Sequence, residues 1–145
     1  MDSTIGETLN HIKFLARHLE KTNLRGTVIV FLMELRAPTK NVGFELLVQS
    51  ILLQHKDPTR ALTNDIYLEV KLRNKQSSEE QVQQAIRETI RIAWERGSQK
   101  AWDWYFSYDG EPVAEKPSVS DFVSRLAYIL ELWQMRCEET CYEEI

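Results

Sequence analysis

The chain has 145 residues, of which 43% are hydrophobic and 28% are charged, and this size and composition predict one globular domain. No apolar run approaches the ~18 residues of a membrane helix, and the N-terminus lacks the basic start and apolar block of a signal peptide, so we expect a soluble cytoplasmic protein with no membrane partner. The net charge is −4, with ten acidic and three basic side chains in residues 101–145, and the lack of a strongly basic stripe argues against tight nonspecific binding to DNA.

The first third of the chain predicts three helices. Apolar residues recur at helical spacing over about residues 3–22, followed by a break at Gly26; they are Ile5, Leu9, Ile12, Ala16 and Leu19. Residues 28–35 are rich in β-branched side chains, but no other segment could pair with them as a strand, so a helix ending before Pro38 is predicted. Residues 42–53 predict a third helix whose inward side chains are Leu46, Leu47, Ser50 and Ile51.

Two further helices are predicted in the middle of the chain. Asp57-Pro58-Thr59 is a helix-start signature, with Asp as the cap and Pro in the first position. The helix that follows runs to about Arg73, with inward side chains Ala61, Leu62, Ile66 and Val70. After a polar turn, Ser77 and Glu80 form a capping box for a helix over residues 78–96 that Gly97 ends. Its core side is Val82, Ala85, Ile86, Ile90, Ala93 and Trp94.

The last third predicts two helices. A short helix around residues 102–106 is rich in aromatic side chains, for which packing in the core is favoured over stacking on nucleic-acid bases. A loop reaches Pro117, and Ser118 or Ser120 caps a final helix with inward Phe122, Leu126, Ile129 and Leu130. Residues 138–145 are expected to fray. The fold predicted from this pattern is all-α, with about six to seven helices and no sheet.

The sequence carries no recognisable enzyme signature, since a glycine-rich phosphate loop, a nucleophile elbow and a His-Glu-x-x-His motif are all missing. Cys137 and Cys141 lie four residues apart, but two thiols without a nearby histidine fall short of a zinc site. His11 and His18 are expected to be half-exposed on a surface helix. We therefore expect neither catalysis nor a bound metal or cofactor.

A helix over residues 61–72, a polar turn and a longer helix over residues 78–96 have the layout of a helix-turn-helix. The side of the second helix opposite its apolar face carries Glu80, Gln81, Gln84, Arg87, Glu88 and Arg91. Arginine can pair with guanine and glutamine with adenine in the major groove. The pattern alone fits an ordinary solvated helix face equally well.

Residues 85–97, A-I-R-E-T-I-R-I-A-W-E-R-G, resemble the recognition helix of the C-terminal effector domain of the sporulation master regulator family, which reads approximately A-I-R-H-A-I-E-V-A-W-S-R-G. Residues 63–67 resemble its first helix-turn-helix helix. Residues 35–44 and 116–122 are similar to two further family segments, so the resemblance covers about residues 27–133.

The resemblance implies an all-helical domain with an embedded helix-turn-helix that binds short promoter boxes in double-stranded DNA and regulates transcription. It also implies a homodimer or pairing with a paralogous regulator. The expected organisation is an added helix over residues 1–25, the domain over 26–136 and an acidic tail over 137–145. Residues 1–25 are too few for a receiver domain, so phosphorelay control is not implied. The expected DNA-binding residues are Lys71, Arg73 and Lys75 on phosphates, and Gln81, Gln84, Arg87, Glu88 and Arg91 on the reading helix.

The sequence departs from the family on the reading helix itself. The family has basic residues at the positions of Gln81 and Gln84, and a histidine at that of Glu88. Glu79 and Glu80 replace small uncharged residues; they suit the positive end of a helix but oppose approach to phosphates. The alternative prediction is therefore a domain that no longer binds DNA and instead contacts a protein, such as a paralogous regulator or RNA polymerase.

Overall fold

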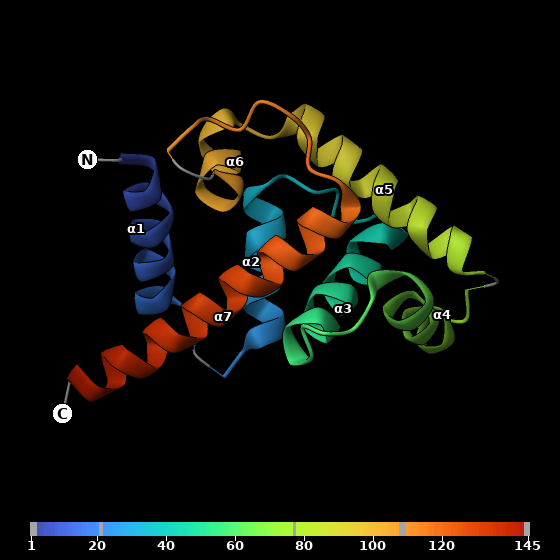
Figure 1. Ribbon diagram of the computed structural model, residues 1–145, viewed down its shortest axis with the longest axis horizontal. Coiled ribbons are helices and arrows are strands. Elements are labelled where there is room, and N and C mark those ends of the chain that lie inside the picture. Colours follow the sequence, from blue (N-terminus) through green and yellow to red (C-terminus); the bar gives the residue numbers. More distant parts are fainter. Residues whose placement is uncertain (1–2, 21, 77, 108–109, 144–145) are drawn as a thin grey trace.

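The structure is a computed structural model that describes residues 3–20, 22–76, 78–107 and 110–143 (Figure 1). The described residues form no strand, which confirms the predicted all-α class. None of their helices is long and apolar enough to cross a membrane. The seven helices are α1 (Ser3–His18), α2 (Leu24–Glu34), α3 (Val42–Lys56), α4 (Tyr67–Asn74), α5 (Glu79–Arg96), α6 (Gln99–Phe106) and α7 (Val119–Glu143).

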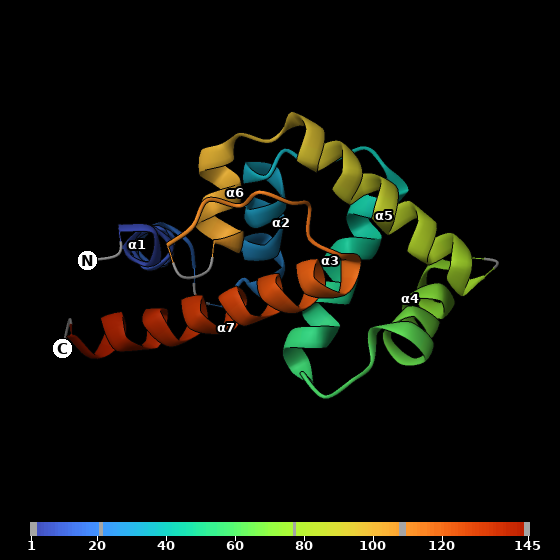
Figure 2. The same cartoon turned by 45° about the horizontal axis from the view of Figure 1, so that its top comes forward.

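Helix α3 lies at the centre of the fold and packs against α2, α5 and α7 (Figures 1 and 2). Its predicted inward side chains are all buried, and they belong to one core cluster with residues of the surrounding helices. Members of this cluster from the other helices include Phe31, Val70, Ile86, Ile90 and Trp133. Because α3 is covered on several sides, nearly all of its apolar residues are removed from solvent, which is the principal favourable contribution to folding.

Helix α1 packs on α6 and α7, at the opposite end of the molecule from α4 and α5 (Figure 1). Its buried line is Thr8, Ile12 and Leu15, whereas Leu9, predicted to face inward, is 47% exposed. The predicted stripe is therefore confirmed at Ile12, which is buried, and at Ala16 and Leu19, which are partly buried against the core, and it is wrong at Leu9. The residues at positions 8 and 15 extend the buried face to one side of that stripe. Ile5 lies outside the residues whose side chains the structure describes.

A polar cluster also joins α1 to α2 and α6. His11 Nε2 lies 2.7 Å from Glu34 Oε1, and the Tyr105 hydroxyl donates a hydrogen bond to the same carboxylate. The His11 ring stacks on Trp104 with centroids 4.0 Å apart, and the His11 side chain is 10% exposed, so the prediction of a half-exposed histidine is wrong. Burial and the Glu34 charge raise the pKa of Tyr105 well above its usual value, which keeps its hydroxyl protonated as a donor.

The predicted break at Gly26 is also misplaced. Helix α2 begins at Leu24, and Asn23 caps it with a side-chain oxygen that accepts the Gly26 N–H at 2.8 Å. Gly26 thus lies in the first turn of α2, and the break between helices falls after His18. The prediction is wrong because it reads a glycine as a helix end, whereas the asparagine three residues earlier favours a helix start. Helix α2 then ends at Glu34, before Pro38 as predicted.

The C-terminal helices close the core as expected from their aromatic residues. Trp102 and Phe106 are buried against Phe122 of α7, with ring centroids 5.1 to 6.0 Å apart. Of the two candidate caps for α7, the structure selects Ser118, whose hydroxyl accepts the Asp121 N–H.

Helix α7 extends to Glu143, through most of the segment in which fraying is expected. Cys137 is buried, with its Sγ 3.9 Å from the Ala16 carbonyl oxygen of α1. The added first helix therefore gives the end of α7 a surface to pack on, which the sequence of α7 alone does not reveal.

Candidate nucleic-acid interface

Helices α4 and α5 form a helix-turn-helix, with a short connection between Asn74 and Glu79. The first of these helices begins later than predicted. Asp57 ends α3, and its carboxylate accepts the N–H and hydroxyl of Thr59 within a loop. Ala61 is exposed, and residues 62–66 form a kinked turn in which Asn64 has a φ of 71°. Asp-Pro-Thr here builds a loop because the same residues that cap helices also stabilise turns.

The turn is held by local hydrogen bonds at both ends. Lys75 adopts a left-handed conformation with a φ of 55°, and the Gln76 N–H donates to the Lys71 carbonyl oxygen at 3.1 Å, the arrangement of a Schellman helix end. The cap of α5 is Ser78, whose hydroxyl accepts the Gln81 N–H at 3.1 Å. The predicted cap, Ser77, lies outside the described residues.

Ser78→Ala is expected to lower the free energy of unfolding by about 1 kcal/mol, the usual loss when a capping side chain is removed. Ser78→Asp should keep most of the stability, because its carboxylate can accept the same N–H. Chemical denaturation of both variants measures the difference. Equal stability of Ser78→Ala and the parent would mean that Ser78 does not cap α5.

The scaffold fixes both helices on α3. The side-chain amides of Gln49 and Asn74 exchange two hydrogen bonds, of 2.7 and 3.1 Å, between α3 and α4. A side chain at Gly43 would place its Cβ 2.2 Å from the Ala85 carbonyl oxygen and 2.2 Å from Thr89 Oγ1. Glycine is therefore required where the first turn of α3 meets the backbone of α5.

The outward face of α5 carries the residues predicted to read DNA. All five are exposed: Gln81, Gln84, Arg87, Glu88 and Arg91. The opposite side of the helix is buried through Val82, Ile86 and Ile90, which confirms the predicted core face. Four glutamates and three arginines occur along α5, so the helix as a whole offers little net attraction for phosphates.

The cations of this region differ in whether they form ion pairs with neighbouring carboxylates. Arg91 pairs with Glu88 at 2.5 Å and with Glu95 at 2.6 Å, and Arg73 pairs with Glu69 of its own helix. The Arg91 guanidinium is the main cause that lowers the pKa of Glu88. In contrast, no ion pair is present at Arg87 within the part of the chain that the structure describes. Arg87 and Arg91 are the two arginines predicted to read the major groove. Arg87 could bind DNA without first breaking an ion pair, whereas Arg91 could not.

Sequence reasoning missed two residues next to Arg87. Tyr67 of α4 and Lys116, in the loop before α7, line one cavity with it. No local pattern in the sequence places Lys116, which follows Arg87 by 29 positions, beside the reading helix. The structure thus adds Lys116 to the cationic groups near α5.

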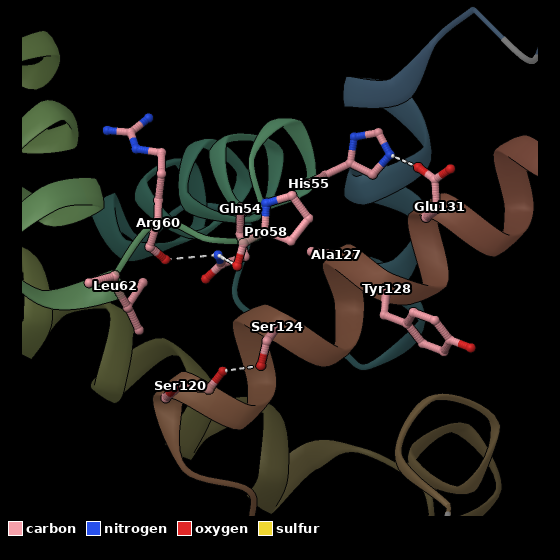
Figure 3. Close-up of a pocket in the computed structure, with 11 residues that line it drawn as sticks. Gln54, His55, Pro58, Arg60, Leu62, Ser120, Ser124, Ala127, Tyr128 and Glu131 are labelled. Atoms are coloured by element: carbon pink, nitrogen blue, oxygen red, sulfur yellow. Dashed lines mark hydrogen bonds and ion pairs between the residues drawn. The ribbon is translucent and has the colours of Figure 1, made fainter.

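A second cavity lies between the end of α3, the loop after it and α7 (Figure 3). His55 Nε2 lies 2.8 Å from Glu131 Oε2, and the Gln54 side-chain amide donates to the carbonyl oxygens of Pro58 and Arg60. The Ser124 hydroxyl donates to the Ser120 carbonyl oxygen. The Gln54 side chain therefore holds the loop that leads into the helix-turn-helix, and the His55–Glu131 contact joins α3 to α7.

Comparison with known protein families matches residues 28–130 to the family described as sporulation initiation factor Spo0A C terminal. The chain belongs to this family. The match spans the helix-turn-helix and most of the helices that support it, whereas α1 and the last part of α7 lie outside the matched residues. Spo0A C-terminal domains are DNA-binding effector domains of a sporulation regulator, so the family is one of transcription regulation.

Proposed function

We propose that this Spo0A C-terminal-type domain binds double-stranded DNA sequence-specifically, with α5 in the major groove and α4 across the sugar–phosphate backbone. The observation that carries the proposal is the exposed face of α5, where Gln84 and Arg87 stand on a helix whose other side is fixed to α3 and α4. Glutamine and arginine supply paired hydrogen-bonding groups for adenine and guanine.

The remaining predicted residues take supporting roles. Lys71, Arg73 and Lys75 lie at the end of α4 and in the turn, where they would contact phosphates. Gln81 lies in the first turns of α5, close to the bases that the start of a recognition helix reads. Glu88 and Arg91 act as a pair, because each neutralises part of the other's charge.

Selection of bound duplexes from random DNA at low salt tests this function. An enriched sequence motif is expected. A well-folded protein that enriches no motif would contradict sequence-specific binding and support the alternative of a protein-interaction module.

Restoring positive charge to α5 should strengthen DNA binding. Gln84→Arg with Glu88→His adds a cation, removes a carboxylate and leaves Arg91 with Glu95 alone. Each added phosphate contact should steepen the dependence of log affinity on log salt by about one unit. The double variant should therefore bind a labelled duplex more tightly, above all at low salt, and favour guanine-containing sites.

Gln134→Arg with Glu138→His is the matched control, since it makes the same changes at the same spacing on α7, away from α5. Titrations at two salt concentrations compare the two double variants with the parent. If the α5 variant folds and binds no more tightly than the α7 control, this face of α5 does not meet DNA.

A further inference from the structure

A cavity of about 360 Å³ opens between the start of α4, one side of α5 and the first turn of α7. In Figure 1 the segment that leads into α7 passes close to α5, and residues 116–118 of this segment line the cavity together with residues of α5. The volume is that of a small-molecule site. The residues that line it are Leu62, Thr63, Tyr67, Gln83, Arg87, Ile90 and 116–120.

Two cations line this cavity, Arg87 from α5 and Lys116 from the loop. Neither forms an ion pair within the described part of the chain, whereas Arg60 pairs with both Asp65 and Glu69 nearby. Lys116 also contributes to lowering the pKa of Glu88, but the Glu88 carboxylate is already hydrogen-bonded to Arg91. The cavity therefore presents two positive charges that are not held in ion pairs by the described residues.

The lining also includes Tyr67, whose buried hydroxyl has no partner among the described residues. Tyr67 is 2% exposed, and no group of the described residues accepts or donates a hydrogen bond at its Oη. Burial raises the pKa of Tyr67 to about 12, and the charge of Arg87 acts against that rise. A buried hydroxyl that makes no hydrogen bond destabilises the fold. A ligand that accepts a hydrogen bond from this hydroxyl would remove that destabilisation.

The rest of the lining suits a negatively charged group attached to an apolar body. The first turn of α7, residues 118–120, contributes the positive end of a helix dipole. Leu62, Ile90, Pro117 and Val119 provide apolar surface. The cavity of Figure 3 differs in this respect, because its Arg60 guanidinium is held in ion pairs and its His55 ring lies against Glu131.

We propose that the cavity between α4, α5 and α7 binds a small phosphorylated ligand. Its phosphate group lies between Arg87 and Lys116 and accepts the Tyr67 hydroxyl, and its ring or other apolar body packs on Ile90 and Pro117. Because Arg87 is shared with the DNA-reading face, a bound ligand competes with DNA; this competition alone rests on the proposed function.

Phenyl phosphate and inorganic phosphate are the probes for this site. Two-dimensional amide spectra of the full chain should shift at residues around the cavity, and phenyl phosphate should bind roughly 10-fold more tightly because its ring buries apolar surface. Lys116→Gln and Arg87→Gln should each weaken phenyl phosphate binding roughly 10-fold, through loss of a charge-assisted hydrogen bond. Arg25→Gln, which removes an exposed cation paired with Glu45, should leave binding unchanged.

Tyr67→Phe separates a ligand-binding role from a structural one. It should weaken phenyl phosphate binding roughly 10-fold while leaving the thermal midpoint equal or higher, because the hydroxyl has no partner in the protein. A lower midpoint with unchanged binding would overturn the role of Tyr67. If Arg25→Gln weakened phenyl phosphate binding as much as the cavity variants do, the binding would be nonspecific attraction to positive charge, and the proposal would be overturned.

A titration with duplex DNA distinguishes a small phosphorylated ligand from a phosphate of the DNA backbone as the group that the cavity binds. If phenyl phosphate leaves the cavity amides unshifted while DNA shifts them and Lys116→Gln weakens only DNA binding, the cavity holds a backbone phosphate and the small-ligand site is overturned. If DNA does not bind at all, the phenyl phosphate titration still decides the proposal, since that measurement does not involve DNA.

Discussion

Gly43→Ala is expected to lower the free energy of unfolding by about 3 kcal/mol, the upper part of the usual range for overpacking a core. The added Cβ would lie 2.2 Å from the Ala85 carbonyl oxygen, a backbone atom that cannot move without displacing α5. The substitution should also weaken DNA binding beyond its effect on stability, because α5 would no longer hold its angle to α4.

Urea denaturation measures the loss of stability, and Gly26→Ala is the matched control. At Gly26 the added Cβ meets only the side chain of Asn23, so the loss there should not exceed about 1 kcal/mol, the value of a helix cap. Equal stability of Gly43→Ala and the parent would show that α3 and α5 do not approach as closely as described.

Arg87→Ala should reduce affinity for a selected duplex by about 1–3 kcal/mol and relax the preference at one base pair, as for a bidentate contact with guanine. Arg91→Ala should cost less, because Arg91 is already paired with Glu88 and Glu95 and would have to leave them to reach DNA. Both residues are exposed arginines on one face of the same helix. The difference between the two variants therefore measures the effect of the ion pairs that Arg91 forms within the protein.

Binding titrations against the selected motif and against single-base variants of it measure both effects. A larger loss for Arg91→Ala than for Arg87→Ala would contradict the assignment of Arg87 as the principal base-reading arginine. Unchanged affinity and motif in Arg87→Ala would remove that residue from the interface.

Helix α5 could be predicted almost completely because local signals agree along its length. Its apolar residues repeat at helical spacing, a serine precedes it and Gly97 caps its end. The start of α4 could not be predicted in the same way, since Asp57-Pro58-Thr59 satisfies the rules for a helix start and for a turn equally well. Only the packing of Ile66 and Tyr67 into the core decides where the helix begins.

The candidate interface was predictable where it depends on a single helix. Exposure of Gln84 and Arg87 follows from periodicity, and the spacing of Glu88, Arg91 and Glu95 is one that forms ion pairs on helices. The contribution of Lys116 was not predictable, because it depends on the path of the loop before α7. His11 was misjudged for the same reason, since Glu34 and Tyr105 come from two distant segments.

The beginning of α1 and the end of α7 lie on the same side of the molecule, apart from each other and remote from α4 and α5 (Figures 1 and 2). Anything joined to either end of the chain, whether a fluorescent reporter, a surface tether or another folded module, is therefore carried away from the reading helix. Such attachments can be made without a long spacer, and a sensor chip loaded through either end presents α5 to the solution.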